Sequence, residues 1–141
     1  MVNNYMAEQE QQNILNKYDP KNLLTSTTGL NADGQELNYN GVYDSLIYRL
    51  NEMGKSGAED LELALKSKND PDEILRLMRK YQNINGESDA NLTSFIQNYD
   101  KAYADNEEAL TKDLTSLQNK LKYANLMSSK HKLQYNNVYD P

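Results

Sequence analysis

The sequence contains no cysteine and no tryptophan, and among its 141 residues it has one histidine, one phenylalanine and three prolines. Without cysteine, neither a disulfide framework nor a thiolate metal site can form. A single histidine, His131, excludes a metal site built on two imidazoles and leaves one residue for any Ser-His-Asp arrangement. The sequence also has no GxGxxG motif and no phosphate-binding glycine loop. We therefore expect a non-enzymatic protein with no catalytic residues, no cofactor and no metal.

Long hydrophobic runs are also missing. No stretch approaches the roughly 18 consecutive apolar residues of a transmembrane helix, so we expect no membrane span. Residues 1–12 lack the basic and apolar regions of a cleavable signal peptide. The sequence therefore predicts a protein that stays in the cytoplasm or that is exported without a cleaved signal peptide, to a secreted or cell-surface assembly.

The charge balance is acidic, with a formal net charge of -6 and an isoelectric point near 4.8. A surface that follows a nucleic acid or an anionic membrane needs clustered Lys and Arg, whereas the 15 basic residues here are scattered. The densest group is Lys120, Lys122, Lys130 and Lys132, which we interpret as a solvated face near a helix C-terminus. We expect no nucleic-acid partner.

Tyrosine is abundant, with 11 residues. A tyrosine can bury its ring and keep its hydroxyl at water or at a partner, which suits half-buried seams and contacts between subunits. Compositional drift, alongside the abundant Asn, Lys and Gln, explains the surplus equally well.

A leucine stripe near the C-terminus is the clearest structural signal. Residues spaced alternately four and three apart lie on one face of an α-helix and form a narrow seam for a partner helix. The stripe consists of Leu110, Leu114, Leu117, Leu121 and Ala124, and toward the N-terminus it continues through Tyr103, Tyr99, Ile96 and Leu92. We predict one helix from about residue 89 to about residue 135, which at about 1.5 Å per residue is about 65–70 Å long.

Beyond Ala124 the same step reaches polar or less apolar residues, namely Ser128, His131 and Tyr135. The apolar Leu126 and Met127 lie off the stripe. We therefore expect the packing partner of the helix to change there.

The N-terminal third reads as a polar arm and loop over residues 1–42. We predict a weak helix up to about residue 18, ordered only in contact with another subunit, and then a short turn capped by Asp19 and Pro20. The Asn40-Gly41 dipeptide predicts a short β-hairpin near residues 36–43. The Asn31-to-Gly34 segment predicts a turn.

Residues 43–141 read as a helical hairpin or small bundle. A helical period returns near Tyr43, and Ser56 with Glu59 has the form of a capping box for a second segment. The clearest helix start is Asp70 as N-cap, Pro71 at the first helical position and Glu73 three residues after the cap. We predict that this helix ends at Asn85-Gly86.

Together these patterns predict an all-α fold with a long, coiled-coil-like C-terminal helix. We expect that helix to pack antiparallel against the helices between Tyr43 and Tyr81, and in an oligomer against its own copies.

The segment from about Leu63 to Asp100 resembles the hairpin of type III secretion needle subunits. In that family two helices meet at a short polar turn that ends in Asp-Pro, and here Asn69-Asp70-Pro71 matches the turn. The residues that follow in similar order are Ile74, Leu75, Leu77, Tyr81, Ser88, Ile96 and Asp100. The resemblance implies a helical subunit that assembles into a filament, although this chain is longer and ends in a polar segment where needle subunits end in an apolar helix.

We therefore expect a structural or assembly subunit with its own copies or other helical proteins as partners. The resemblance implies a type III-like secretion needle or filament, linked to virulence. Two alternatives stay open. The first is an acidic helical chaperone or adaptor that binds the amphipathic helix of a partner. The second is a structural protein of a phage.

Overall fold

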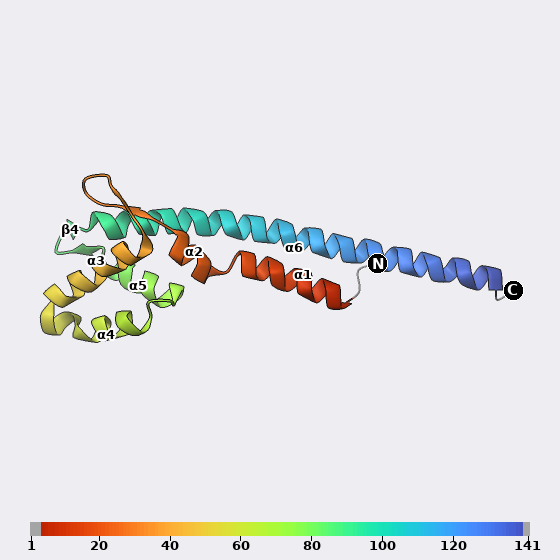
Figure 1. Cartoon of the computed structure of the whole chain (residues 1–141), viewed down its shortest axis with the longest axis horizontal. Coiled ribbons are helices and arrows are strands. Elements are labelled where there is room, and N and C mark those ends of the chain that lie inside the picture. The colour runs from red at the N-terminus through yellow and green to blue at the C-terminus, as the bar shows by residue number, and fades with distance from the viewer. Residues whose placement is uncertain (1–3, 140–141) are drawn as a thin grey trace. The chain divides into compact units, whose positions relative to one another are not determined.

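The chain forms two compact units in the computed structural model, which describes the backbone of residues 4–139 and the side chains of residues 6–127. The described residues of 1–18 and 106–141 form unit 1, and residues 19–105 form unit 2. Helix α6 (Ala90–Tyr139) contributes its first turns to unit 2 and the following turns to unit 1 (Figure 1). One continuous helix over the predicted range is therefore confirmed. The predicted boundary at residue 42 differs from this division, since it lies inside unit 2.

Unit 2 consists of shorter helices and two small hairpins around the first turns of α6 (Figure 1). The structure is mostly helical, which confirms the all-α fold class. The elements of unit 2 before α6 are α2 (Pro20–Ser26), β1 (Gly29–Leu30), β2 (Glu36–Leu37), α3 (Tyr39–Glu52), the 3-10 helix η1 (Gly54–Gly57), α4 (Ala58–Lys66), α5 (Pro71–Tyr81), β3 (Asn83–Ile84) and β4 (Glu87–Ser88).

The core of unit 2 forms where α3, α5 and the first turns of α6 meet. These helices carry apolar residues three and four apart, which places them on one stripe of each helix. Phe95 is fully buried, and its ring centroid lies 5.7 Å from that of Tyr39 and 6.5 Å from that of Tyr99. The other buried core residues are Leu24, Val42, Tyr43, Leu46, Leu50, Ala64, Ile74, Leu75, Leu77, Met78, Tyr81, Leu92 and Ile96.

The hairpin in the N-terminal third lies upstream of the predicted turn. Strands β1 and β2 pair antiparallel, with Gly29 opposite Leu37. Their turn is the Asn31-to-Gly34 segment, as its composition predicts. The Asn31 carboxamide oxygen accepts hydrogen bonds from the N–H of Asp33 and of Gln35, at 3.0 and 2.9 Å.

The predicted hairpin turn at Asn40-Gly41 is wrong, because both residues lie in the first turn of α3. Asn38 caps this helix, and its side-chain oxygen accepts a hydrogen bond from the N–H of Gly41 at 2.9 Å. Tyr39 and Val42 are both buried, at a helical spacing. The helix therefore begins at Tyr39 and not near Tyr43.

A second hairpin occupies the place where the sequence predicts only a helix end. Strands β3 and β4 pair antiparallel, with Ile84 opposite Glu87. Asn85 and Gly86 form the turn with φ of +52° and +80°. Positive φ at both central residues is what a two-residue type I′ turn requires. Helix α5 itself ends at Tyr81.

Arg49 of α3 holds this second hairpin in place. Its guanidinium donates hydrogen bonds to the carbonyl oxygens of Tyr81 and Gln82, at 2.8 and 2.9 Å, and to that of Glu87 at 2.8 Å. Tyr81 and Gln82 lie at the end of α5, where backbone carbonyls have no partner within the helix. One side chain therefore caps α5 and fixes β4.

The predicted starts of α2 and α5 are confirmed. The Asp70 carboxylate accepts a hydrogen bond from the N–H of Glu73 at 3.3 Å, with Pro71 at the first helical position. The Asp19 carboxylate accepts one from the N–H of Lys21 at 3.0 Å. Both pairs satisfy amides that the first helical turn leaves without a partner.

The predicted capping box at Ser56 is wrong. The Ser56 hydroxyl donates a hydrogen bond back to the carbonyl oxygen of Met53 at 2.8 Å, within η1. Helix α4 follows directly, and its N-cap position, Gly57, has no side chain to cap with. The two glycines of this segment therefore produce a tight 3-10 turn between α3 and α4.

Unit 1 is an antiparallel pair of helices, α1 (Asn4–Lys17) and the turns of α6 after residue 105 (Figure 1). The predicted N-terminal helix is confirmed, and within this chain it packs on α6. Within residues 4–139, none of the helices combines the length and the apolar character that a bilayer crossing requires.

We predict that Arg49→Met lowers the free energy of unfolding by about 1.5–3 kcal/mol, because three backbone carbonyls lose a charged hydrogen-bond donor. Chemical denaturation followed by circular dichroism measures this loss. Arg76→Met is the matched control, because Arg76 is exposed on α5, where its salt bridge is to Glu73, and exposed pairs contribute little. Equal losses in the two variants would contradict the anchoring role of Arg49.

Asp60 joins α4 to α5. Its carboxylate pairs with the Lys80 ammonium at 2.8 Å and accepts a hydrogen bond from the Tyr81 hydroxyl, with 14% of the side chain exposed. The hydrogen bond from Lys80, followed by that from Tyr81, lowers the pKa of Asp60 below its ordinary value of 3.8. The contribution of this carboxylate to stability is therefore complete above pH 3.8 and is lost as the pH falls through the lowered, folded-state pKa.

We predict that Asp60→Asn lowers the melting temperature at pH 7 and that the difference from the wild type shrinks as the pH falls below 3.8. Thermal melts at pH 7 and at acid pH measure it. Asp105→Asn, at an exposed position on α6, should match the wild type at both pH values. A deficit in Asp60→Asn that stays constant down to acid pH would refute the linkage.

Candidate interaction surfaces

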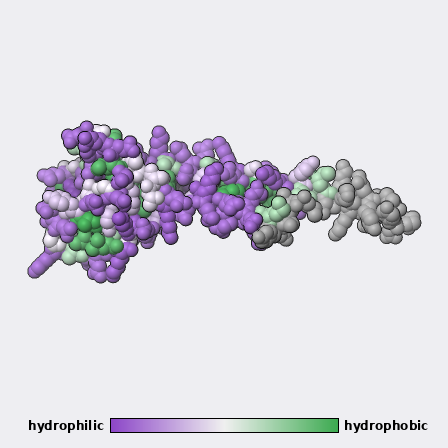
Figure 2. Space-filling model, in the orientation of Figure 1, coloured by the Kyte–Doolittle hydropathy of each residue, from purple (hydrophilic) through white to green (hydrophobic). Residues whose placement is uncertain are grey.

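The predicted leucine seam lies against α1 inside unit 1. Leu117 is 6% exposed, and Leu110, Leu114, Leu121 and Ala124 are half-buried. The expected antiparallel partner between Tyr43 and Tyr81 is therefore not the partner of this part of the seam. In Figure 2 hydrophobic side chains show as green between the hydrophilic edges of α1 and α6.

Polar contacts fix the register of the two helices in unit 1. The Tyr18 hydroxyl donates a hydrogen bond to the Asp113 carboxylate at 2.7 Å. Two turns further along α6, the Lys120 ammonium lies 3.5 Å from the Glu10 carboxylate of α1. Between these pairs a cleft of about 280 Å³ is lined by residues that include Ile14 and Leu117. The side chains of α1 and α6 therefore do not fill the space between the two helices completely.

Sequence reasoning missed α1 as the partner of the seam. The signal is present but weak, because Ala7, Ile14 and Tyr18 follow heptad spacing and are half-buried. Only Ile14 among them is a strongly apolar aliphatic residue. Polar residues between them hide the stripe, and Asp113 and Glu10 contribute through pairs that spacing does not reveal.

The N-terminal part of the predicted seam belongs to unit 2. Leu92, Ile96 and Tyr99 are buried in its core, against α3 and α5. Tyr103 is 40% exposed and stacks on Tyr99, with 6.0 Å between the ring centroids. The two parts of the stripe therefore have different packing partners, and the residues Asp70, Pro71 and Glu73 lie in unit 2 as the start of α5.

A groove of about 530 Å³ lies beside Tyr103 on unit 2. Arg79 and Asp100 cross it as a two-point ion pair, with N–O distances of 2.9 and 2.5 Å. The Arg79 guanidinium lowers the pKa of Asp100, and burial raises the pKa of Tyr99 to about 12. The groove is also lined by Asp72, Leu75 and Arg76. The two arginines and the two aspartates that line the groove balance each other in charge.

The face of unit 2 that Figure 2 shows is mostly hydrophilic, with a smaller hydrophobic patch where α3, α4 and α5 meet.

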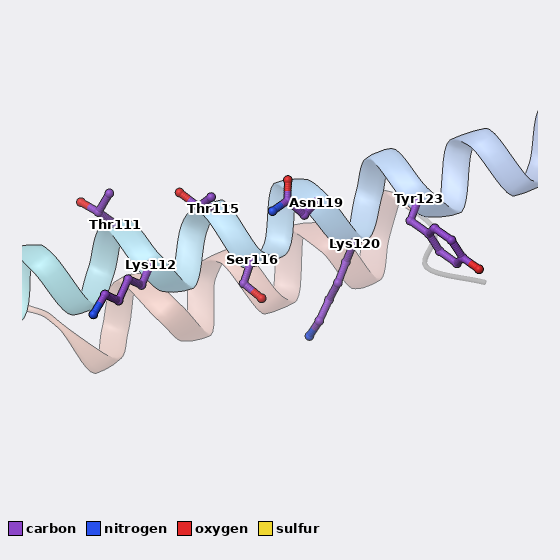
Figure 3. A pocket seen from close by; sticks show the side chains of 7 residues that line it. All are labelled: Thr111, Lys112, Thr115, Ser116, Asn119, Lys120 and Tyr123. Carbon is purple, nitrogen blue, oxygen red and sulfur yellow. The ribbon is translucent and has the colours of Figure 1, made fainter.

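A second groove, of about 610 Å³, runs along α6 in unit 1 and is here named the lysine groove. Lys112, Ser116 and Lys120 point to one side of the helix, at intervals of one turn, and Thr111, Thr115 and Asn119 form the other edge (Figure 3). Tyr123 closes one end. The serine between two long cationic side chains leaves a notch.

Several predicted residues lie outside the described side chains, namely Ser128, Lys130, His131, Lys132 and Tyr135. Among the described residues, no three His, Cys, Asp or Glu side chains are grouped to hold a metal ion. The grooves and the cleft described above lie on helical faces of the two units.

We predict that Leu117→Asp separates the helices of unit 1, because burying a charge without a partner costs several kcal/mol. Circular dichroism should show a loss of helix content. Gln118→Asp, at the neighbouring exposed position of α6, is the control and should keep the helix content of the wild type. If Leu117→Asp keeps it too, the seam does not hold unit 1 together.

No family model, no curated protein and no solved structure matches the chain.

Proposed function

We propose that this protein is a non-enzymatic structural subunit that assembles with its own copies through unit 1. The observation that carries the proposal is the incomplete burial of the seam. Among the described side chains of unit 1, Leu117 is the only buried apolar residue, and 6% of its surface is still exposed. Four other seam residues stay half-buried, because a single helix covers only one side of a stripe.

The energetics of a helix pair support this proposal. Two helices expose most of their apolar surface, and stable bundles usually surround a core with more of them. Unit 1 also keeps apolar side chains on its outer surface, with Leu126 at 66%, Met127 at 45%, Met6 at 51% and Leu15 at 43% exposure. Further helices from neighbouring copies would cover both the seam and these residues.

Within this class, we propose a subunit of a secretion needle or a similar helical filament. The support is the resemblance of the segment from about Leu63 to Asp100 to the hairpin of type III secretion needle subunits. In this chain the turn at Asn69-Asp70-Pro71 lies between the two helices α4 and α5. Both helices are short here, and their apolar residues fill the core of unit 2.

We expect sedimentation velocity over a wide concentration range to show species that grow with concentration. Negative-stain microscopy of the heaviest species should then show filaments or closed rings. A compact monomer at high concentration, with no partner, would refute the assembly proposal. A single stoichiometric heterologous partner in a pull-down, without self-association, would favour the chaperone or adaptor alternative.

A further inference from the structure

The two lysines of the lysine groove keep most of their surface in water. The Lys112 side chain is 75% exposed and lies 3.4 Å from Glu108, and the Lys120 side chain is 59% exposed and lies 3.5 Å from Glu10. Exposed pairs of this kind are weak and exchange readily with other partners. Both cations are therefore available to a binding partner that brings its own carboxylates.

The spacing of the lysines defines what fits between them. Eight residues of α-helix place Lys112 and Lys120 two turns apart, which is about 12 Å along the axis. A complementary helix needs two carboxylates at the same interval and a side chain between them that fills the notch above Ser116. Two copies of the lysine groove do not satisfy this, because lysine would face lysine.

Helix α3 carries this complementary pattern on its outer face. Asp44 and Glu52 are also eight residues apart, and both are exposed. Tyr48 lies midway between them and is 68% exposed, which makes it the most exposed tyrosine among the described residues. Its ring suits the space between two lysine side chains, where a cation can also lie over an aromatic face.

The charge of the two units points the same way. Residues 19–105, which form unit 2, hold 15 of the 21 acidic and 9 of the 15 basic side chains, and so carry the whole net charge of -6. Unit 1 therefore carries no net charge and does not repel unit 2. The local charges, two carboxylates on α3 and two ammonium groups in the lysine groove, favour their contact, whereas two acidic faces would repel each other.

We propose that the α3 face of one copy, formed by Asp44, Tyr48 and Glu52, docks in the lysine groove of the next copy. Asp44 and Glu52 pair with Lys112 and Lys120, and the Tyr48 ring lies over Ser116. The contact joins two different surfaces, so each added copy leaves one groove and one face open. Such head-to-tail contacts produce filaments or closed rings. This inference rests on the proposed self-assembly and adds to the seam a second contact between copies, on a different face of α6.

Charge reversal on each surface tests the contact. The groove variant is Lys112→Glu with Lys120→Glu, and the face variant is Asp44→Lys with Glu52→Lys. Each variant alone brings like charges together. We therefore expect the protein concentration at which it assembles to rise by at least about tenfold over the wild type. Lys101→Glu with Lys122→Glu is the matched control, since it makes the same charge change at exposed positions of α6 outside the groove.

Mixing the two variants is the decisive experiment. An equimolar mixture pairs each acidic groove with a lysine-bearing face and each natural groove with a natural face, so assembly should return to the wild-type concentration range. Circular dichroism and thermal melts of each variant confirm that the fold is intact. Sedimentation velocity provides the readout.

Three outcomes overturn the inference. If both variants assemble like the wild type, the contact does not exist, although self-assembly stands. If each variant is monomeric and the mixture stays monomeric, the two surfaces do not meet. If the wild type itself never assembles, the proposed function fails, and this contact fails with it.

Discussion

Burial of the Phe95 ring is the contact on which the arrangement of unit 2 depends. The ring belongs to the first turns of α6 and packs beside the Tyr39 ring of α3, and the Phe95 Cβ lies close to β1. Gly29 in β1 approaches so closely that an added Cβ would lie 3.0 Å from the Asn91 carbonyl oxygen and 3.3 Å from the Phe95 Cβ. The absence of a side chain at Gly29 therefore allows the hairpin to lie on the helix. Ser94 strengthens the contact, since its hydroxyl accepts a hydrogen bond from the N–H of Leu30 at 2.7 Å.

Polar side chains bring the peripheral segments of unit 2 onto this core. Arg49 reaches from α3 to three carbonyl oxygens around the second hairpin, and the Tyr39 hydroxyl donates to the carbonyl oxygen of Lys68 before α5. The Asn98 carboxamide donates to the carbonyl oxygen of Thr28 at 2.8 Å. Backbone groups in short loops need partners when water is partly excluded. The tyrosine surplus serves the same purpose in part, because Tyr39, Tyr43 and Tyr81 bury their rings while their hydroxyls make hydrogen bonds.

Unit 1 contrasts with unit 2 because its stability rests on one narrow seam. Tyr18, Lys17 and Asp113 form polar contacts at one end, and Lys120 and Glu10 form another further along. Between them the seam leucines stay half-buried. This difference between a closed core and an open seam is the physical basis for our proposal that unit 1 carries self-assembly. The acidic α3 face and the exposed lysines of α6 are the basis for the second contact that we propose between copies.

The sequence by itself determined that the chain is helical and where α2 and α5 begin, because these features depend on neighbouring residues. The leucine spacing set one unbroken α6, and Asp70 with Pro71 set the start of α5 through a hydrogen bond within four residues. The two Asn-Gly dipeptides show the limit of such local rules. Asn40-Gly41 lies in a helix, because the Asn38 side chain accepts a hydrogen bond from the Gly41 N–H. Asn85-Gly86 instead forms a hairpin turn, and Arg49, which is distant in sequence, holds that hairpin through the Glu87 carbonyl oxygen. Only the tertiary structure decided which helix covers which stretch of the leucine stripe, since spacing defines an apolar face but does not specify its partner.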